Sequence, residues 1–554
     1  MAIRLTGIAS GLDTDAIVSD LVSAYSYKVQ GYEKQKTKME WTQEAWSSLN
    51  KDVYSYYTKQ LGTMRFQSAY SAMTSTLSNS AYASVSATTG AVSGTQTLTV
   101  SSVASSAGMT GKQLSGDYTS STKLSELGVT GDSENPTSFK ISAGGTDYTV
   151  EVTADTTLSG LASAIKNATN GAVTANFDAT NGRFFLSASS TGEDGNFTLK
   201  ADSSTGADLL SAIGFADGAR TDYAEGVYTD DTAGYSASRG TNAKITLNGA
   251  EFTSSSNKFS INGLNITAQA EGTTSINTSV DSQAVYDKIK SALSEYNSLI
   301  NNMTSLYNAD SAKDYEPLTD EEKDAMSDTE IEKWEKKIKD SLLRRDSTLN
   351  SIISAMSTAM SKSYYVNDTG SAIKYNSKTG TYQINNKDIE YNGSTVSDAD
   401  TLKRYASENG FSSYSLSSFG ISTLGILQAG TNEQHAYHID GDSDDTVTSS
   451  NSDKLLDAIN NKPNAVMGFF SALFSDSYST LGEKMSSSTL SSAYTIYNDK
   501  QMKTEMSEIE DTIEDWQEKL EELQDYWYSK FSAMETALAK LQSEQSSLAS
   551  LLGS

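Results

Sequence analysis

Residues 502–551 read MKTEMSEIEDTIEDWQEKLEELQDYWYSKFSAMETALAKLQSEQSSLASL. Along this segment apolar side chains recur at alternating steps of four and three residues, the spacing of a coiled-coil helix. Of the 15 heptad positions 13 are apolar, and the exceptions are Lys530 and Glu544. At ~1.5 Å per residue the segment predicts a helix of roughly 75 Å, which needs a partner along its length. The positions are Met502, Met506, Ile509, Ile513, Trp516, Leu520, Leu523, Trp527, Lys530, Met534, Ala537, Leu541, Glu544, Leu548 and Leu551.

The N-terminal region supplies a candidate partner for this helix. Asp13 is suited to cap a helix that we expect over about 15–82, a range without proline. Apolar residues recur at Ile17, Leu21 and Ala24, and the stripe resumes beyond a polar segment. Two interpretations stay open: the inner portions form a helical hairpin within one chain, or the outermost portions pair with other subunits. The later positions of the stripe are Met39, Trp46, Leu49, Val53 and Tyr56.

Between the two ends the sequence predicts β-structure. Asn-Gly at 248–249 and 262–263, and Gly-Gly at 144–145, supply the positive φ angles that two-residue hairpin turns require. Each turn sets residues of the two flanking strands opposite each other on one face of the hairpin. A short helix is expected near 158–165. The expected opposite pairs are Leu247–Ala250, Ile245–Phe252, Ile261–Leu264, Phe259–Ile266, Ile141–Tyr148 and Phe139–Val150.

These patterns predict an α+β multidomain protein. Terminal helices form a coiled-coil leg, and antiparallel β-rich head domains are inserted between them. An acidic connector carries two capping boxes, Thr319 with Glu322 and Ser327 with Glu330, which predict two further helices. The expected domains are 1–40 with 520–554, a terminal coiled-coil or disordered leg domain; 41–82 with 281–519, a helical leg domain with a small β region; 83–119 with 226–280, a β head domain; and 120–225, an inserted outer α+β head domain.

Composition excludes several classes of function. The 554 residues carry a formal net charge of −28, and phosphate binding needs clustered cations, so we expect no nucleic-acid partner. Cysteine is absent, which excludes disulfides, thiolate zinc sites and cysteine nucleophiles. No segment approaches the ~18 apolar residues of a membrane span, and the N-terminus lacks the apolar run of a secretory signal. We therefore expect no membrane insertion and no cleaved signal peptide.

The residues offer little for catalysis or metal binding. His435 and His438 are the two histidines of the chain, too few for most acid–base or metal chemistry. Acids at alternate positions from Asp440 resemble the start of a calcium loop, but Asp445 stands where glycine is needed and Asn451 where glutamate is needed. We expect an acidic surface loop there. The sequence predicts no catalytic residue, no metal site, no cofactor and no enzymatic activity.

Residues 7–18, which read GIASGLDTDAIV, resemble the N-terminal signature of the flagellar filament capping protein family, also called flagellar hook-associated protein 2 or FliD. The similarity extends over nearly the whole chain apart from 120–225. The chain departs from the family in lacking a proline over 25–35 and in its long polar insert, 313–339. The other similar segments are 242–266, 285–306, 342–349 (LLRRDSTL), 419–423 (FGIST), 454–474 and the terminal coiled coil.

The resemblance implies a structural cap at the distal tip of the bacterial flagellar filament. It implies an extracellular ring that prevents flagellin leakage, promotes flagellin folding and polymerisation, and is needed for filament elongation and motility. Implied partners are further copies of the chain in the ring, flagellin, hook–filament junction proteins and a cytosolic export chaperone, with export by the flagellar type III route. The outer portions, about 1–40 and 520–554, are expected to be disordered in the monomer and to order against filament subunits. The residues expected to make filament or self-assembly contacts are Ile8, Leu12, Ile17, Leu21, Trp516, Leu520, Leu523, Trp527, Leu541, Leu548 and Leu551.

Two other interpretations stay open. A surface adhesin would bind host glycans through its head domains, which are rich in Ser, Thr and Asn. Truncating 120–225 would then abolish adhesion, whereas capping would need the terminal legs. A flagellin-like subunit would polymerise into long filaments, whereas a cap would stop at a small ring.

Overall fold

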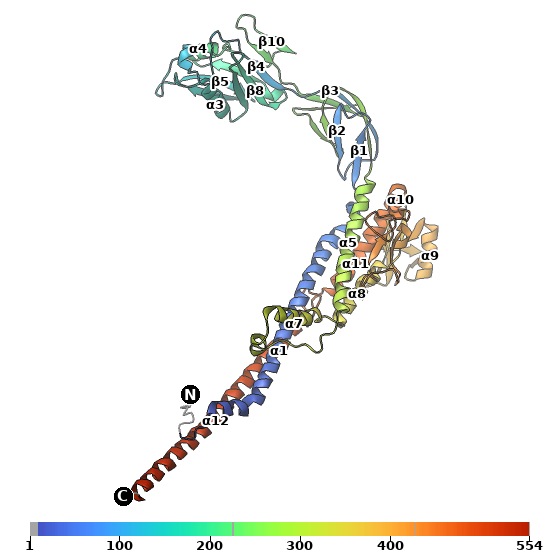
Figure 1. Ribbon diagram of the computed structural model, residues 1–554. Helices are drawn as coiled ribbons and strands as arrows, with labels where there is room; N and C mark the ends of the chain where they lie inside the picture. Colours follow the sequence, from blue (N-terminus) through green and yellow to red (C-terminus); the bar gives the residue numbers. More distant parts are fainter. Residues whose placement is uncertain (1–8, 224–225, 426, 553–554) are drawn as a thin grey trace. The chain divides into compact units, whose positions relative to one another are not determined.

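The computed structural model describes residues 9–223, 226–425 and 427–552. The chain divides into two compact units, Met1–Tyr70 with Ser282–Ser554, and Ser71–Asp281. The first unit is mainly helical and contains both terminal helices, and the second is built mainly of antiparallel sheets (Figure 1). The predicted α+β class, with a β-rich insertion between terminal helices, is confirmed.

The β unit begins with two antiparallel sheets around one core. The first sheet has the order β1-β16-β3-β12-β13, and the second has the order β14-β15-β2. Leu98, Ile245 and Leu264 are fully buried between them. The strands are β1 (Met73–Leu77), β2 (Ala83–Ala87), β3 (Gly94–Ser102), β12 (Ala243–Leu247), β13 (Ala250–Ser254), β14 (Lys258–Ile261), β15 (Leu264–Ala268) and β16 (Gly272–Val280).

A second core in the β unit is formed by other sheets and two helices. The sheets have the orders β10-β11-β4-β8-β7 and β6-β5-β9, and Phe139, Leu161 and Phe184 are fully buried in this core. Since β4 pairs with both β8 and β11, this layer extends beyond the predicted limits 120 and 225. The elements are β4 (Ser106–Thr110), η3 (Leu124–Leu127), β5 (Thr137–Ala143), β6 (Thr146–Val152), α3 (Leu158–Ala168), β7 (Val173–Asp178), β8 (Arg183–Thr191), η4 (Glu193–Gly195), β9 (Phe197–Ala201), α4 (Ser204–Ala212), β10 (Val227–Thr229) and β11 (Ser236–Ser238).

The three predicted hairpins are confirmed in register. Leu247 lies opposite Ala250 and Ile245 opposite Phe252, and the other two hairpins also show the expected pairs. The turn residues Asn248 and Gly249 have φ of 51° and 87°, the left-handed conformation that favours this dipeptide. Local turn chemistry therefore fixes the register of these strand pairs.

The predicted N-terminal helix over 15–82 is too long. Helix α1 (Thr14–Ser55) continues into a π-helical turn, η1 (Tyr56–Leu61), and then into α2 (Gly62–Met64) and η2 (Gln67–Tyr70). Beyond this point Met73–Leu77 pair with β16, so this Thr-containing segment is a strand. Its backbone groups find partners in the sheet, and threonine favours that environment over a helix.

The remaining elements of the helical unit have two cores, an aromatic one on α11 and a smaller one of Ile373, Ile389, Val396, Leu402 and Ala406. The helix that begins at Pro463 has its proline at the first helical position, as expected, and its side chains Phe469, Phe470 and Phe474 are fully buried. The helices are α5 (Ser282–Tyr307), α6 (Asp320–Asp324), α7 (Asp328–Asp340), α8 (Ser347–Met360), α9 (Ala399–Glu408), η5 (Leu416–Phe419), α10 (Lys454–Asn461), α11 (Pro463–Lys484) and α12 (Asp499–Leu552). The strands are β17 (Tyr364–Asn367), β18 (Ile373–Asn376), β19 (Thr381–Ile384), β20 (Lys387–Asp388), β21 (Glu390–Tyr391), β22 (Ser394–Thr395), β23 (Phe411–Tyr414), β24 (Ile421–Thr423) and β25 (Tyr437–Ile439).

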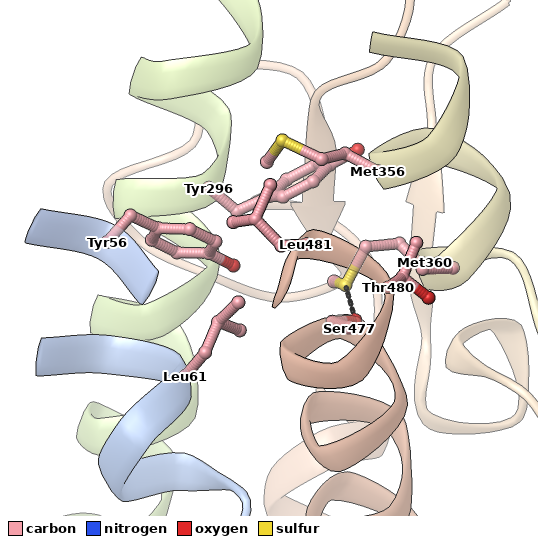
Figure 2. Close-up of a pocket in the computed structure, with 9 residues that line it drawn as sticks. Tyr56, Leu61, Tyr296, Met356, Met360, Ser477, Thr480 and Leu481 are labelled. Carbon is pink, nitrogen blue, oxygen red and sulfur yellow. Dashed lines mark hydrogen bonds between the residues drawn. The ribbon is translucent and has the colours of Figure 1, made fainter. Parts of the chain in front are cut away.

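A cavity of about 10 Å³ lies where η1 faces α5, α8 and α11 (Figure 2). It has room for about one water molecule, so it is no site for a larger ligand. The phenols of Tyr56 and Tyr296 line it, and their buried hydroxyls have no hydrogen-bond partner among the residues that the structure describes. Burial raises the pKa of both phenols, so both are neutral. The full lining is Tyr56, Leu61, Tyr296, Met356, Ala359, Met360, Ser477, Thr480 and Leu481.

The acidic connector packs against the N-terminal helix. The ammonium of Lys34 on α1 lies 2.8 Å from the Glu322 carboxylate, and the ammonium of Lys339 on α7 lies 4.4 Å from the ring centre of Trp41. The hydrogen bond from Lys34 is the main cause that lowers the pKa of Glu322. The capping box of Thr319 with Glu322 is confirmed at the start of α6.

Candidate functional site: the paired terminal helices

The two terminal helices run antiparallel within one chain. Figure 1 shows α1 and α12 side by side. At one end of the pair Trp46 stacks on Tyr497, with ring centroids 5.5 Å apart, and at the other Tyr528 donates a 2.9 Å hydrogen bond to Asp15. Between them the ammonium of Lys36 lies 2.9 Å from the Glu510 carboxylate, whose hydrogen bond raises the pKa of Lys36. The hairpin of the inner portions is therefore formed within the chain. It also continues into the outer portions.

This continuation differs from the expected disorder of the outer portions. The described part of 1–40 begins α1 at Thr14, and 520–552 are helical throughout. Burial of Val18 and Val22, which are 1% and 2% exposed, accounts for the order because their apolar surface is already covered by α12.

In the first turns of α1 the buried face is displaced by one residue from the predicted stripe, whereas the later predicted positions Trp46, Leu49 and Val53 are buried as expected. Val18 and Val22 are buried, whereas Leu21 is 42% exposed and Ile17 is half-buried. Neighbouring apolar residues are about 100° apart around a helix, so only one of two adjacent stripes can face the partner. The buried residues of α1 are Thr14, Val18, Val22, Val29, Trp46, Leu49 and Val53.

In the middle of the helix pair, Trp516 of α12 contacts side chains of both helices. Its ring lies 5.9 Å from the ring of Tyr25 between centroids, and the ammonium groups of Lys28 and Lys519 lie 4.3 Å and 4.8 Å from its centre. Cations near an indole face are attracted to its negative quadrupole. An apolar heptad position thus also receives positive charge from both helices.

The contact face of α12 shifts beyond Trp527. Up to that residue the predicted heptad positions are half-buried, but then Phe531 and Leu538 are half-buried while Ala537 and Leu541 are exposed. A straight helix drifts by about 20° per heptad against a strict seven-residue repeat, which explains the change of face at Phe531 and Leu538. From Leu541 to Ser550 every residue is exposed, because α1 begins at Thr14, opposite Tyr528, and the described chain places no helix beside this end of α12. The predicted stripe is therefore correct for the first part of α12 and wrong as a buried stripe for its end. Leu541 and Leu548, 61% and 58% exposed, lie on a face that the described chain leaves uncovered.

The predicted contact residues fall into three groups. Leu12, Leu21, Leu541 and Leu548 are exposed and available to another molecule. Ile8 lies outside the described residues, and for Leu551 the structure describes the helix but not the side chain. The half-buried members of the helix pair are Ile17, Trp516, Leu520, Leu523 and Trp527.

The segment that begins α1 contacts three polar residues of α12 that were not among the predicted site residues. Tyr528 binds Asp15, as described above, and the amide of Gln542 donates a 2.9 Å hydrogen bond to the carbonyl of Ala9. The carboxylate of Glu535 accepts hydrogen bonds from Ala9 and Ser10. No periodicity distinguishes these residues from the other polar residues of the helix.

The acidic loop after β25 forms ion pairs and hydrogen bonds with nearby groups of the chain. The ammonium of Lys290 lies 2.6 Å from both the Asp442 and the Asp444 carboxylates. His438 lies 2.6 Å from Asp445, whose pKa is lowered although burial alone would raise it, because backbone N–H groups and the imidazole stabilise the charge. Among the described residues no group of acidic and histidine side chains is arranged to hold a metal ion.

Within the described part of the chain, every helix is too short or too polar to cross a bilayer.

Comparison with known families gives three matches. Residues 240–543, more than half of the chain, match the family "Flagellar hook-associated protein 2 C-terminus", and residues 10–107 match the family for its N-terminus. Residues 138–190, in the second core of the β unit, match the "Flagellin hook IN motif".

Individual relatives are more distant. Flagellar hook-associated protein 2 of Halalkalibacterium halodurans is 34% identical over 105 residues, 19% of this chain and 20% of that protein. The aligned part thus spans about a fifth of the relative's length. The D1-D2-D3 domains of the flagellar cap protein FliD from Escherichia coli are 18% identical, with a TM-score of 0.47 over 84% of this chain and 99% of that one. FliD (HAP2) from Pseudomonas aeruginosa PAO1 is 25% identical, with a TM-score of 0.31 over 40% and 93% of the two chains. On the family match over 240–543, which covers more than half of its length, this chain belongs to the flagellar hook-associated protein 2 (FliD) family.

Proposed function

We propose that this protein is a structural cap at the distal tip of the bacterial flagellar filament. Further copies of the chain form a ring that retains flagellin, helps it to fold and polymerise, and so supports filament elongation and motility. The protein reaches the tip through the flagellar type III route with a cytosolic chaperone, and hook–filament junction proteins are further partners. No enzymatic step is part of this role.

The observation that carries the proposal is a set of exposed leucines on the terminal segments, Leu12, Leu21, Leu541 and Leu548, which we call the uncovered face. Leu541 and Leu548 lie at the end of a helix that already pairs with α1, and that partner does not cover them. Leu12 and Leu21 at the start of the chain are exposed as well. In a chain of this family, such leucines support docking of the leg on neighbouring subunits or on flagellin.

The size of this face supports docking that is reversible. Burying a leucine completely is worth about 1.5–3 kcal/mol, so four leucines that are roughly half exposed contribute about 3–6 kcal/mol. Association costs on the order of 4–15 kcal/mol in lost freedom of motion, so a single leg docks weakly. Several legs joined in one ring dock together with a much higher effective concentration. One leg can then detach while the others hold the cap on a growing filament.

The test uses cells that lack their own cap protein. The double variant Leu541→Gln with Leu548→Gln keeps helix propensity but removes the apolar face, and Lys540→Gln with Ser547→Gln is the matched control on exposed polar positions. We expect the leucine variant to release flagellin monomers into the medium and to form short filaments or none. The control is expected to restore filaments and swimming.

Equal capping by the leucine variant and the control would contradict the proposal. Long filaments formed by the purified chain alone would indicate a flagellin-like subunit instead. Normal filaments with loss of attachment to host glycans after removal of 120–225 would assign adhesion to the head as a separate role.

A further inference from the structure

One carboxylate in the second half of α12 is buried, although the helix beyond it is exposed. Glu535 is 3% exposed, while residues 541–550 of the same helix are all exposed. Burying a carboxylate is unfavourable unless hydrogen bonds or cations compensate it. Among the residues that the structure describes, no cation forms an ion pair with Glu535. Its charge must therefore be compensated by hydrogen bonds.

The N-terminal segment supplies these hydrogen bonds. The backbone N–H groups of Ala9 and Ser10 donate to one carboxylate oxygen at 2.7 Å and 3.2 Å, and the hydroxyl of Ser10 donates to the other. Gln542, two helical turns further on, binds the carbonyl of Ala9. The serine hydroxyl and the Ala9 N–H, together with the Ser10 N–H, keep the pKa of Glu535 below its usual value.

The local sequence around this contact fixes the shape of the segment. The Ser10 oxygen also accepts the N–H of Leu12 at 3.2 Å, and Gly11 has φ of 73°, a left-handed turn that suits glycine. Asp13 then caps α1 by accepting the N–H of Ala16. The segment thus presents two successive N–H groups, the arrangement that backbone nests use to bind anions.

We propose that Glu535 and Gln542 form a binding site for Ala9 and Ser10, through which the two ends of the chain become ordered together. The carboxylate is buried only when the segment is bound, and the segment is held only while the carboxylate is in place. Coupling of this kind is reciprocal, so a change at either end loosens the other. The site concerns the isolated chain and stands independently of the proposed capping function.

Hydrogen exchange on the full-length chain tests the site. Glu535→Gln removes the charge but keeps the shape, and Glu544→Gln is the matched control because Glu544 is exposed on the same helix. In Glu535→Gln we expect the amides of Ala9 and Ser10 to exchange about 10- to 100-fold faster, the factor that a charge-assisted hydrogen bond supplies. In the control they exchange at the wild-type rate.

A second variant tests the reciprocal effect. Removal of residues 1–11 is expected to speed exchange over 531–542 of α12 while leaving 499–516 unchanged. Unchanged exchange of the N-terminal amides in Glu535→Gln, or unchanged exchange of 531–542 in the truncated chain, would overturn the proposal. Both measurements are made without flagellin, so their failure is distinct from a failure of the capping function.

Discussion

We predict that a mutation on the buried face of the terminal helices weakens the pairing of α1 with α12, whereas a mutation on the exposed face hardly changes it. Val22→Ala removes two methyl groups from a side chain that is 2% exposed, which costs about 1.6 kcal/mol in burial and up to ~1 kcal/mol for the cavity. Alanine returns about 0.6 kcal/mol through its higher helix propensity. The net loss of pairing between α1 and α12 is about 1–2 kcal/mol. Leu541→Ala, at a position that is 61% exposed, is expected to change pairing by less than about 0.5 kcal/mol.

Hydrogen exchange of the α1 amides in the purified chain measures the pairing. Since about 1.4 kcal/mol is a factor of ten, Val22→Ala should speed exchange about 5- to 30-fold, and Leu541→Ala should change it by no more than about 2-fold. In cells we expect Leu541→Ala to have the larger effect on capping, because it removes surface that the proposed docking uses, although it keeps the hairpin. If Leu541→Ala loosened α1 as much as Val22→Ala did, the assignment of buried and exposed faces would be refuted.

Three further predictions concern other parts of the chain. Tyr56→Phe and Tyr296→Phe should each raise the free energy of unfolding by about 1 kcal/mol in urea titrations, because each removes a buried hydroxyl without a described partner; a loss of similar size would show that the hydroxyl is hydrogen-bonded. The N-terminal segment should stay bound to Glu535 at pH values above the usual pKa of a glutamate and detach as the pH falls through the lowered pKa of Glu535. The NMR chemical shifts of the segment's amides would follow the detachment, and a contact that is unchanged down to pH 2 would contradict the prediction. Gly263→Ala should destabilise the β unit more than Gly249→Ala does in thermal unfolding, since both have positive φ but only at Gly263 would a Cβ lie 2.4 Å from a neighbouring backbone nitrogen; equal losses would refute the steric argument.

Local chemistry explains which parts of the fold were predictable. The Asn248–Gly249 turn dictates its own geometry, so the strand register on both sides follows from a few adjacent residues. The capping box of Thr319 and the proline that begins α11 are equally local signals. The sheet that joins β4 to β8 depends on residues about 80 positions apart, and no local pattern specifies that pairing.

The candidate site was predictable as a pair of helices but not in its faces. Ile17 and Val18 are both apolar, and only the position of α12 decides which of them is buried. Glu535 is one carboxylate among many on an acidic helix, and its burial becomes visible only when Ala9 and Ser10 are placed beside it. The four predicted domains and the assembly contacts stay predictions.

Site-specific cross-linking at the filament tip tests the central claim most directly. The chain contains no cysteine, so Leu541→Cys introduces the one thiol to which a photoreactive maleimide can be attached, and Ser543→Cys, also exposed on α12, is the control. Illumination of capped filaments should cross-link position 541 to flagellin or to a second copy of the chain, in much higher yield than position 543. Equal or absent cross-linking at the two positions, on filaments that are still capped, would contradict docking through the uncovered face of α12.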